Sequence, residues 1–208
     1  MQGSAIFFDA LSPRHGSGFA FDVWYMNHYL PCVLRSRPYL GMRRYGSPSL
    51  GIHLAIFEAA ALPPVEARRG LPGHDDIVRT ERYVAKQAGE RIATGAGRDA
   101  LEANFVYPVF FRVPADREAE FDAWYTEEHL AILLRCPYWP MCRRFKVIDP
   151  GPDSPTHLAL HYLTDLRALE SDERTRARST PWRDRLAREP WFRGDYRVYH
   201  RCGSGGAA

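Results

Sequence analysis

The feature that most constrains this chain is a repeat with a period of one hundred residues. Residues 21–45 align without a gap with residues 121–145, and nine of the 25 aligned positions are identical. Unrelated segments would share roughly one or two identities, so a duplication is the simplest interpretation. Because the 208 residues divide into two domains of about 100 residues each, we expect one domain in residues 1–100 and its copy in residues 101–208.

The composition is ordinary for a globular protein. The chain is 45% hydrophobic and 25% charged, with a net charge of +3, and no apolar run approaches the roughly 20 residues of a membrane-spanning helix. Acidic residues are scattered among the arginines, which disfavours nucleic-acid binding. The first residues show no secretory signal, and the four cysteines form no CxxC pair. We therefore expect a cytoplasmic protein without membrane or nucleic-acid partners.

The pattern of apolar residues predicts the same order of elements in both copies. Each copy begins with a short strand (residues 5–10 and 105–112), continues with a helix (about 18–35 and 114–134), and adds two strands (42–45 and 52–57, then 141–147 and 157–162). In the second copy a helix at 166–188 and a closing strand at 195–200 complete the order β-α-β-β-α-β. The fold class predicted is α+β, with two tandem ferredoxin-like domains whose sheets are antiparallel. In the first copy, residues 62–73 and 89–97 are rich in Pro and Gly and have no clear assignment.

The motif of the second copy carries a family resemblance. It runs from Phe121 to Leu130 as Phe-Asp-Ala-Trp-Tyr-Thr-Glu-Glu-His-Leu and is followed by Arg143-Arg144-Phe145. In this motif the chain resembles the dimeric α/β-barrel superfamily, and especially its EthD-like members. The resemblance implies that the two sheets pair within one chain as a barrel, giving a monomeric pseudo-dimer or a homodimer. The superfamily includes cyclases, isomerases, decarboxylases, cofactor-free monooxygenases and haem-binding enzymes, so the fold does not select a reaction.

The two copies diverge where the chemistry is expected. The family-like His is His129 in the second copy, while Tyr29 stands there in the first, and Glu128 corresponds to His28. A histidine on an aromatic helix can serve as a general acid or base. We therefore expect the working site in the second copy, with His129, Tyr125 and His161 as catalytic residues.

A wider set of side chains is predicted to contact substrate: His157, Glu128, Arg143, Trp124, Tyr29 and His28. Each has a structural alternative. His157 recurs as His53 in the first copy and could simply bond the adjacent turn, Trp124 could pack the helix on its sheet, and an inward arginine could pair with Asp122. His157 and His161 share one face of a strand, yet no third ligand stands at a diagnostic spacing, so no metal site is predicted.

Several enzyme classes lack any signature in this chain, since GxSxG, GxGxxG, phosphate-loop and HExxH motifs are all missing. The leading hypothesis is a cofactor-independent enzyme of secondary or aromatic metabolism that binds an apolar or aromatic small molecule. Its acid–base reaction would be a cyclisation, isomerisation, dehydration or decarboxylation, of the lyase, isomerase or cyclase type. Two alternatives stay open: a haem-dependent enzyme of the same fold, and a small-molecule-binding protein without catalytic activity.

Overall fold

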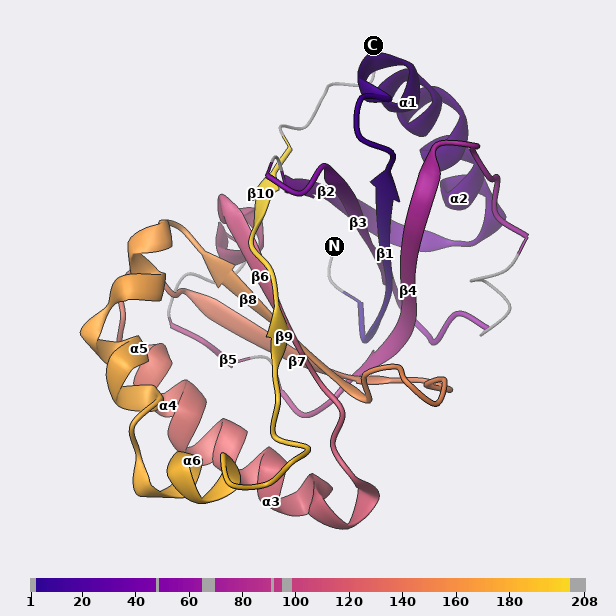
Figure 1. Ribbon diagram of the computed structural model, residues 1–208. Coiled ribbons are helices and arrows are strands. Elements are labelled where there is room, and N and C mark those ends of the chain that lie inside the picture. The colour runs from indigo at the N-terminus through magenta and orange to yellow at the C-terminus, as the bar shows by residue number, and fades with distance from the viewer. Residues whose placement is uncertain (1–2, 48, 65–69, 91, 95–98, 203–208) are drawn as a thin grey trace. The chain divides into compact units, whose positions relative to one another are not determined.

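The computed structural model describes residues 3–47, 49–64, 70–90, 92–94 and 99–202 (Figure 1). The chain forms two compact units. Unit 1 comprises residues 1–87, 147–149 and 199–208, and unit 2 comprises residues 88–146 and 150–198. These bounds differ from the predicted repeats 1–100 and 101–208, because the chain returns to unit 1 twice after residue 100.

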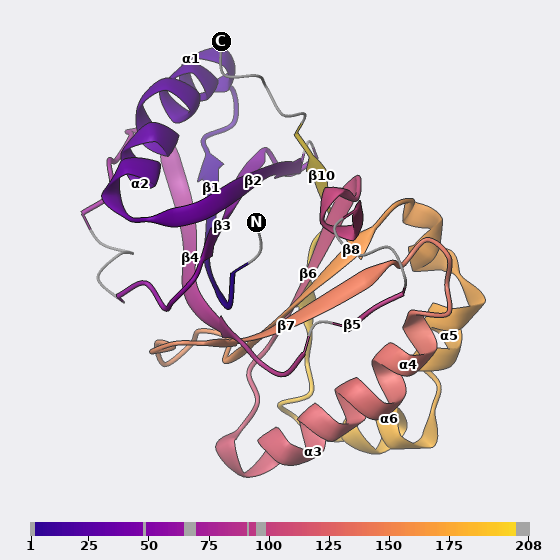
Figure 2. The same ribbon diagram turned by 180° about the vertical axis from the view of Figure 1, so that it is seen from behind.

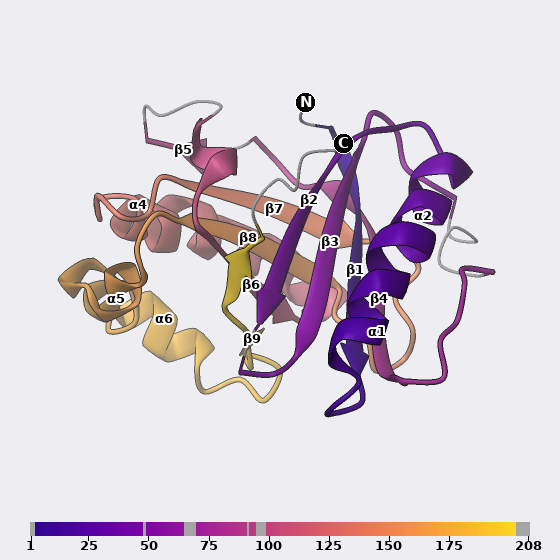
Figure 3. The same ribbon diagram turned by 90° about the horizontal axis from the view of Figure 1, so that it is seen from above.

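Unit 1 is an antiparallel sheet with a helical layer on one face. Its strands are β1 (Ala5–Pro13), β2 (Tyr39–Ser47), β3 (Ile52–Ala59) and β4 (Ile77–Gln87), in the spatial order β2-β3-β1-β4. A short strand, β10 (Tyr199–Arg201), extends this sheet beyond β2. The helices α1 (Gly18–Trp24) and α2 (Leu30–Ser36) cover one side of the sheet (Figure 3).

Unit 2 repeats this strand order. Its strands are β6 (Phe105–Phe111), β7 (Met141–Val147), β8 (His157–Leu163) and β9 (Asp195–Tyr196), in the order β7-β8-β6-β9, with β5 (Ile92–Ala93) beside β7. The helices α3 (Glu118–Ala123) and α4 (Leu130–Leu133) run along one face of this sheet (Figure 2). The shorter α5 (Asp172–Ala177) and α6 (Pro181–Leu186) lie beside them. Each unit therefore has the ferredoxin-like strand order.

A π-helical turn interrupts the first helix of both units at equivalent positions. In unit 1 it is η1 (Tyr25–Tyr29), and in unit 2 it is η5 (Trp124–His129). The i→i+5 hydrogen bonds of a π turn bring residues five apart onto one face, and such turns are frequent at functional sites. Trp124 accordingly lies against His129, with ring centroids 4.7 Å apart, and Trp24 lies against Tyr29 at 5.2 Å.

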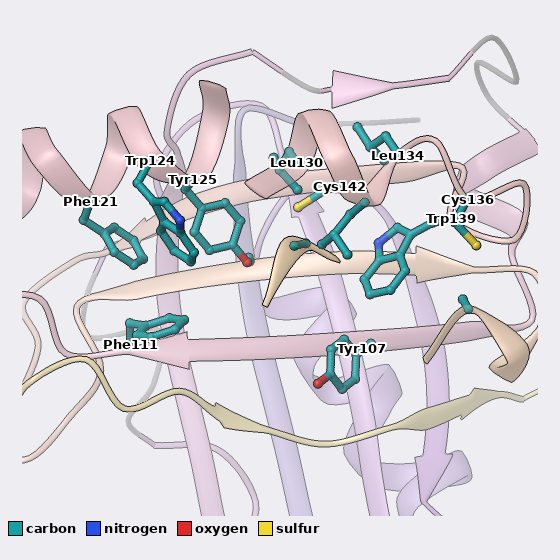
Figure 4. Packing of buried hydrophobic residues seen from close by; sticks show 14 of the residues in the cluster. Tyr107, Phe111, Phe121, Trp124, Tyr125, Leu130, Leu134, Cys136, Trp139 and Cys142 are labelled. Atoms are coloured by element: carbon teal, nitrogen blue, oxygen red, sulfur yellow. The ribbon is translucent and has the colours of Figure 1, made fainter. Parts of the chain in front are cut away.

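Each unit has its own aromatic core between helix and sheet. In unit 2, the buried rings of Phe121, Trp124 and Tyr125 point from the helix toward the strands, where Phe111 lies against Phe121 (Figure 4). In unit 1 the corresponding cluster includes Phe7, Phe21, Tyr25, Tyr29 and Phe57. The repeated motif therefore supplies the core of both units. Trp124 is 2% exposed, as predicted for a core residue, whereas Trp24 is only half-buried.

Two predicted elements differ from the structure. The segment predicted as one helix at 166–188 is divided into a 3-10 turn, η6 (Leu166–Glu170), then α5 and α6. Side chains of Asp165, Ser171 and Thr180 cap the three pieces, and each cap favours a new helix start. Residues 195–200 do not form one closing strand, since β9 pairs with β6 whereas β10 belongs to unit 1.

The fourth strand of unit 1 was missed by the sequence analysis. It is β4, which pairs with β1 along its length. The described residues between β3 and β4, 60–64 and 70–76, contain no helix. The helices α5 and α6 of unit 2 therefore have no counterpart in this part of the chain. No helix in the described segments is long and apolar enough to cross a membrane.

Candidate functional site

A cavity of about 130 Å³ lies in unit 2 between the helices and the sheet. Its walls are mostly aromatic, with two histidines and three arginines among them. The residues that line it are Tyr107, Val109, Phe111, Trp124, Tyr125, His129, Leu133, Trp139, His161, Arg174, Arg178, Arg183, Phe192, Gly194 and Tyr196. Apolar walls with a few convergent polar groups are typical of small-molecule sites.

Two hydrogen bonds fix the protonation of His161, which β8 places at the centre of the site. The indole Nε1–H of Trp139 donates to His161 Nδ1 at 3.0 Å. An indole can only donate, so Nδ1 must accept, and a neutral imidazole then carries its proton on Nε2. Burial lowers the pKa of His161 well below its ordinary value, and the nearby imidazole of His129 acts in the same direction. The ring is therefore neutral near pH 7.

The Nε2–H of His161 consequently donates to the hydroxyl oxygen of Tyr125, 2.8 Å away. Figure 4 shows the Tyr125 hydroxyl and the Trp139 indole nitrogen directed toward each other from opposite sides of this space. Because Tyr125 accepts this bond, its own hydroxyl hydrogen needs another acceptor. No residue in the described part of the chain accepts it. Burial raises the pKa of Tyr125 far above its usual value, so the hydroxyl remains a donor.

His129 offers a hydrogen-bond acceptor to the cavity, whereas Tyr125 offers a donor. Its Nδ1 lies 3.3 Å from the carbonyl oxygen of Ala177, so Nδ1–H donates and Nε2 keeps a free lone pair. Burial lowers the pKa of His129 to about 4, and the charges of Arg178, Arg183 and Arg174 add to this effect. The cavity is therefore lined by a hydrogen-bond donor, the Tyr125 hydroxyl, and by an acceptor, Nε2 of the neutral His129 imidazole.

The three arginines of the cavity come from α5, α6 and the turn between them. The sequence did not predict them as site residues. Arg174 and Arg183 each occupy the third position after a cap, since Ser171 and Thr180 accept hydrogen bonds from their backbone N–H groups at 3.2 Å. The sequences Ser-Asp-Glu and Thr-Pro-Trp are typical helix starts, and they could have predicted two short helices that carry these arginines. Burial raises the pKa of Tyr107, while a hydrogen bond from Arg174 and the charges of Arg174 and Arg178 lower it.

Of the predicted site residues in unit 2, His129, Tyr125, His161 and Trp124 come together around the cavity, and three others lie outside it. Glu128 accepts a hydrogen bond from Thr180 Oγ1 at 2.5 Å, which ties α6 to the π turn. Arg143 is fully buried, and its guanidinium lies 4.8 Å from the ring centroid of Phe145. His157 contacts the adjacent Thr156 hydroxyl at 2.9 Å, the turn-bonding alternative recognised in the sequence.

The two predicted residues of unit 1 are not brought together. Tyr29 is buried and donates to Asp9 Oδ2 at 2.6 Å, while Arg82 donates to both Asp9 Oδ1 at 3.0 Å and the Tyr29 hydroxyl at 2.8 Å. His28 is exposed on the helix surface. The side chain at the position of His129 is thus held within a closed polar triad.

Strand register identifies the unit 1 counterparts of the other site residues. Phe7 and Met42 are opposite Phe57, just as Tyr107 and Cys142 are opposite His161. Phe57 therefore stands in the place of His161. The Tyr25 hydroxyl, which is equivalent to that of Tyr125, is buried and has no hydrogen-bond partner among the described residues. Unit 1 accordingly lacks the hydrogen-bonded relay.

The described residues contain no cluster of three or more His, Cys, Asp or Glu side chains suited to a metal ion. His157 and His161, which share a strand face, differ in their partners: His161 has both ring nitrogens bonded to Trp139 and Tyr125. A neutral histidine needs a free nitrogen lone pair to bind a metal, and Nδ1 of His161 already uses its lone pair.

No family model and no curated protein matches this sequence. Solved structures do resemble it. An anthrone oxidase-like protein has a TM-score of 0.66 and 10% identity, covering 95% of this chain and 91% of that chain. A ferredoxin fold protein of Listeria monocytogenes related to antibiotic biosynthesis monooxygenases has a TM-score of 0.56 and 11% identity, over 97% and 96%. A haem-degrading enzyme from Listeria monocytogenes has a TM-score of 0.54 and 9% identity, over 94% and 98%.

These similarities establish the fold. They show an α+β, ferredoxin-like protein, consistent with the dimeric α/β-barrel superfamily predicted from the sequence. At such low identity the chemistry of a neighbour does not transfer with its fold. The EthD-like assignment, the tandem duplication and the pairing of the two sheets stay predictions.

Proposed function

We propose that unit 2 is an acid–base enzyme that removes a proton from an oxygenated aromatic small molecule. The observation that carries this proposal is the relay from Trp139 through His161 to Tyr125 in the wall of an aromatic cavity, because it leaves the Tyr125 hydroxyl donor without an acceptor among the described residues. Buried polar groups are nearly always hydrogen-bonded. A ligand oxygen in the cavity completes the bonding of Tyr125.

The reaction step uses two side chains of the π turn η5 that line the cavity, His129 and Tyr125. His129 Nε2 takes a proton from a carbon next to a carbonyl group, and the electron pair of the broken C–H bond moves onto the carbonyl oxygen as an enolate. The Tyr125 hydroxyl donates a hydrogen bond to this oxygen, as preorganised donors do in oxyanion-stabilising sites. His161 acts as a positioning residue, because both its nitrogens are already bonded.

The positive field of the arginines supports this assignment. The charges of Arg178, Arg183 and Arg174 disfavour the protonated form of His129 in the empty cavity. An enolate next to them carries the opposite charge and offsets that effect, so the pKa of His129 rises toward neutrality as the anion forms. Proton transfer is efficient when the pKa of the base approaches the working pH.

Isomerisation, cyclisation and dehydration share this proton-transfer step. The anthrone in the name of one structural neighbour is an aromatic ketone with acidic hydrogens, and a compound of this chemical kind suits the proton-transfer step. We therefore retain a cofactor-independent reaction and place it on oxygenated aromatic ketones or phenols.

Haem does not fit this cavity. Its volume of about 130 Å³ is close to that of an engineered cavity of about 150 Å³ that holds benzene. A porphyrin is several times larger than benzene. His161 is not suited to ligate iron either, since both of its ring nitrogens are already bonded. No step through haem is derived.

The proposal is tested by hydrogen exchange into two ketones with a single aromatic ring and acidic C–H groups, 2-indanone and phenylacetone, in D₂O. Mass spectrometry follows deuterium uptake. We expect the protein to accelerate uptake into at least one of them, and His129→Gln to reduce the enzymatic rate by about 10²–10⁴-fold, the range for a lost general base. His28→Gln, an exposed histidine of unit 1, is the matched control and should retain the parent rate. Exchange at the buffer rate with both ketones would contradict the proposal and favour a binding protein without activity.

A further inference from the structure

The cavity of unit 2 carries more positive charge than the proposed proton transfer needs. Three of its lining residues are arginines, and none of its lining residues is acidic. All three come from one short stretch, residues 174–183, that folds over the cavity as α5, the following turn and α6. Three guanidinium groups in one wall repel one another, and a bound anion relieves that repulsion.

The arginines of α5, α6 and the turn between them divide into two groups by their partners. Those outside the cavity wall are paired with carboxylates: Arg176 lies 3.1 Å from Glu173, and Arg185 lies 3.2 Å from Glu120. Within the wall, Arg174 donates to the backbone carbonyl of Leu169 at 2.7 Å, which leaves its charge without a carboxylate counterion in the described part of the chain.

The other two wall arginines, Arg183 and Arg178, differ in whether a carboxylate lies near the guanidinium group. Arg183 lies 3.6 Å from Asp184, whose carboxylate is 58% exposed to solvent. Solvent screening makes such a contact weak. Arg178 has no side-chain hydrogen bond or carboxylate contact in the described part of the chain. A guanidinium offers a planar fork of donors that matches a carboxylate, and in Arg178 this fork is free.

The charge of this group reaches the interior of the cavity. All three arginines disfavour protonation of His129, and two of them lower the pKa of the Tyr107 hydroxyl. Tyr107 and His129 belong to different elements, the strand β6 and the π turn η5. A ligand in the cavity therefore experiences a positive potential from these arginines.

We propose that the cavity selects ligands with an anionic substituent on a single aromatic ring, and that Arg178, with Arg174 and Arg183, binds this anion. The inference rests on the proposed function for its site and adds the substrate class. The ring occupies the apolar part, whose volume suits one benzene ring, and a carboxylate lies against the guanidinium groups. The part of the substrate that loses a proton then lies between His129 and Tyr125.

The test compares benzoate with benzamide, which has nearly the same shape and no charge. Binding is followed by NMR titration of the indole N–H of Trp139, which lines the cavity. We expect benzoate to bind at least tenfold more tightly than benzamide, with an affinity that falls as salt is added. Arg178→Gln should weaken benzoate binding by about 10- to 100-fold, the range for one lost charged hydrogen bond, and should leave benzamide binding unchanged.

The matched control is Arg176→Gln, on the same helix but paired with Glu173 outside the cavity. It should leave both affinities at the parent value. Equal binding of benzoate and benzamide by the parent protein overturns the anion site, as does an equal loss in the two arginine variants. Absence of any titration with either compound also overturns it. The exchange rates of the uncharged ketones decide the proposed function separately, so the two ideas can fail independently.

Discussion

The two units build the same strand order around the same motif, yet the polar groups at equivalent positions have different partners. In unit 2, His161 joins Trp139 to Tyr125 at the wall of a cavity. In unit 1, Phe57 stands in the place of His161, and Asp9, Tyr29 and Arg82 satisfy one another. A polar group that is bonded within the protein serves stability, whereas one left with an unused donor is available to a ligand.

This difference shows that the repeated aromatic motif builds the core in both units and does not by itself make a site. Phe21, Tyr25 and their counterparts Phe121 and Tyr125 are buried in both units, so the shared residues build the core. The residues that distinguish the units, His129 against Tyr29 and His161 against Phe57, determine whether the shared tyrosine belongs to a polar site: Tyr125 is hydrogen-bonded to His161, and Tyr25 has no such partner in the described part of the chain. The predictions that follow compare equivalent positions in the two units.

The largest effect is expected from truncating the aromatic residue that supports the site. Trp124 is 2% exposed and packs on His129, Phe121 and Phe192. Trp124→Ala should lower the free energy of unfolding by about 3–5 kcal/mol. Trp24→Ala, at the half-buried equivalent position, should lower it by less than about 2 kcal/mol. Urea denaturation measures both, and equal losses would show that the two units do not differ in packing here.

A smaller loss is expected from opening the triad of unit 1. Asp9 is fully buried and accepts hydrogen bonds from Tyr29 and Arg82. Asp9→Asn keeps the shape and removes the charge that faces Arg82, so we expect a loss of about 3 kcal/mol, the lower end for breaking a buried pair. Asp153→Asn, in an exposed pair with Arg112, should cost less than about 0.5 kcal/mol. An Asp9 variant as stable as the parent would remove the structural role of the triad.

The pH dependence of stability should differ between the parent and a variant without His129. The folded protein holds the pKa of His129 at about 4, against an ordinary 6.5. Between these values the unfolded chain binds more protons than the folded chain, so stability falls as the pH is lowered from 7 toward 4. The charged groups around this imidazole are Arg174, Arg178 and Arg183, which remain charged throughout this range. The shift corresponds to about 3 kcal/mol.

His129→Gln removes this contribution. Its free energy of unfolding should therefore fall by up to about 3 kcal/mol less than that of the parent between pH 7 and pH 4. Denaturation at a series of pH values measures the difference. Parallel curves for the two proteins would mean that His129 is not held in its neutral form.

Much of the fold could be predicted from the sequence, because periodicity and turn residues set it locally. The first helix of each unit and the strands at 141–147 and 157–162 lie close to the predicted ranges. The strand β4 was missed, since Arg79, Glu81 and Arg82 interrupt its apolar pattern. Its charged side chains reflect an interior polar partner: Arg82 pairs with the buried Asp9, and such a contact between distant residues leaves no local signal.

The candidate site was predictable in part. The contrast of His129 with Tyr29 is visible in an alignment of the two repeats, and strand alternation brought His161 to the helix-facing side. The locked protonation of His161 depends on Trp139, a residue 22 positions away, and no spacing rule links the two. The arginines of the cavity wall were overlooked because residues 166–188 were interpreted as a single helix, whereas caps at Ser171 and Thr180 redirect the chain.

The most direct measurement of the central claim compares the equivalent tyrosines of the two units in the ketone exchange assay. Both hydroxyls are buried, but Tyr125 is hydrogen-bonded to His161 whereas Tyr25 has no partner in the described part of the chain. Tyr125→Phe should reduce the exchange rate by about 10- to 1,000-fold, because it removes the donor to the enolate oxygen. Tyr25→Phe should keep the rate within twofold of the parent. Equal losses in both variants, or a loss in Tyr25→Phe alone, would contradict the assignment of the working site to unit 2.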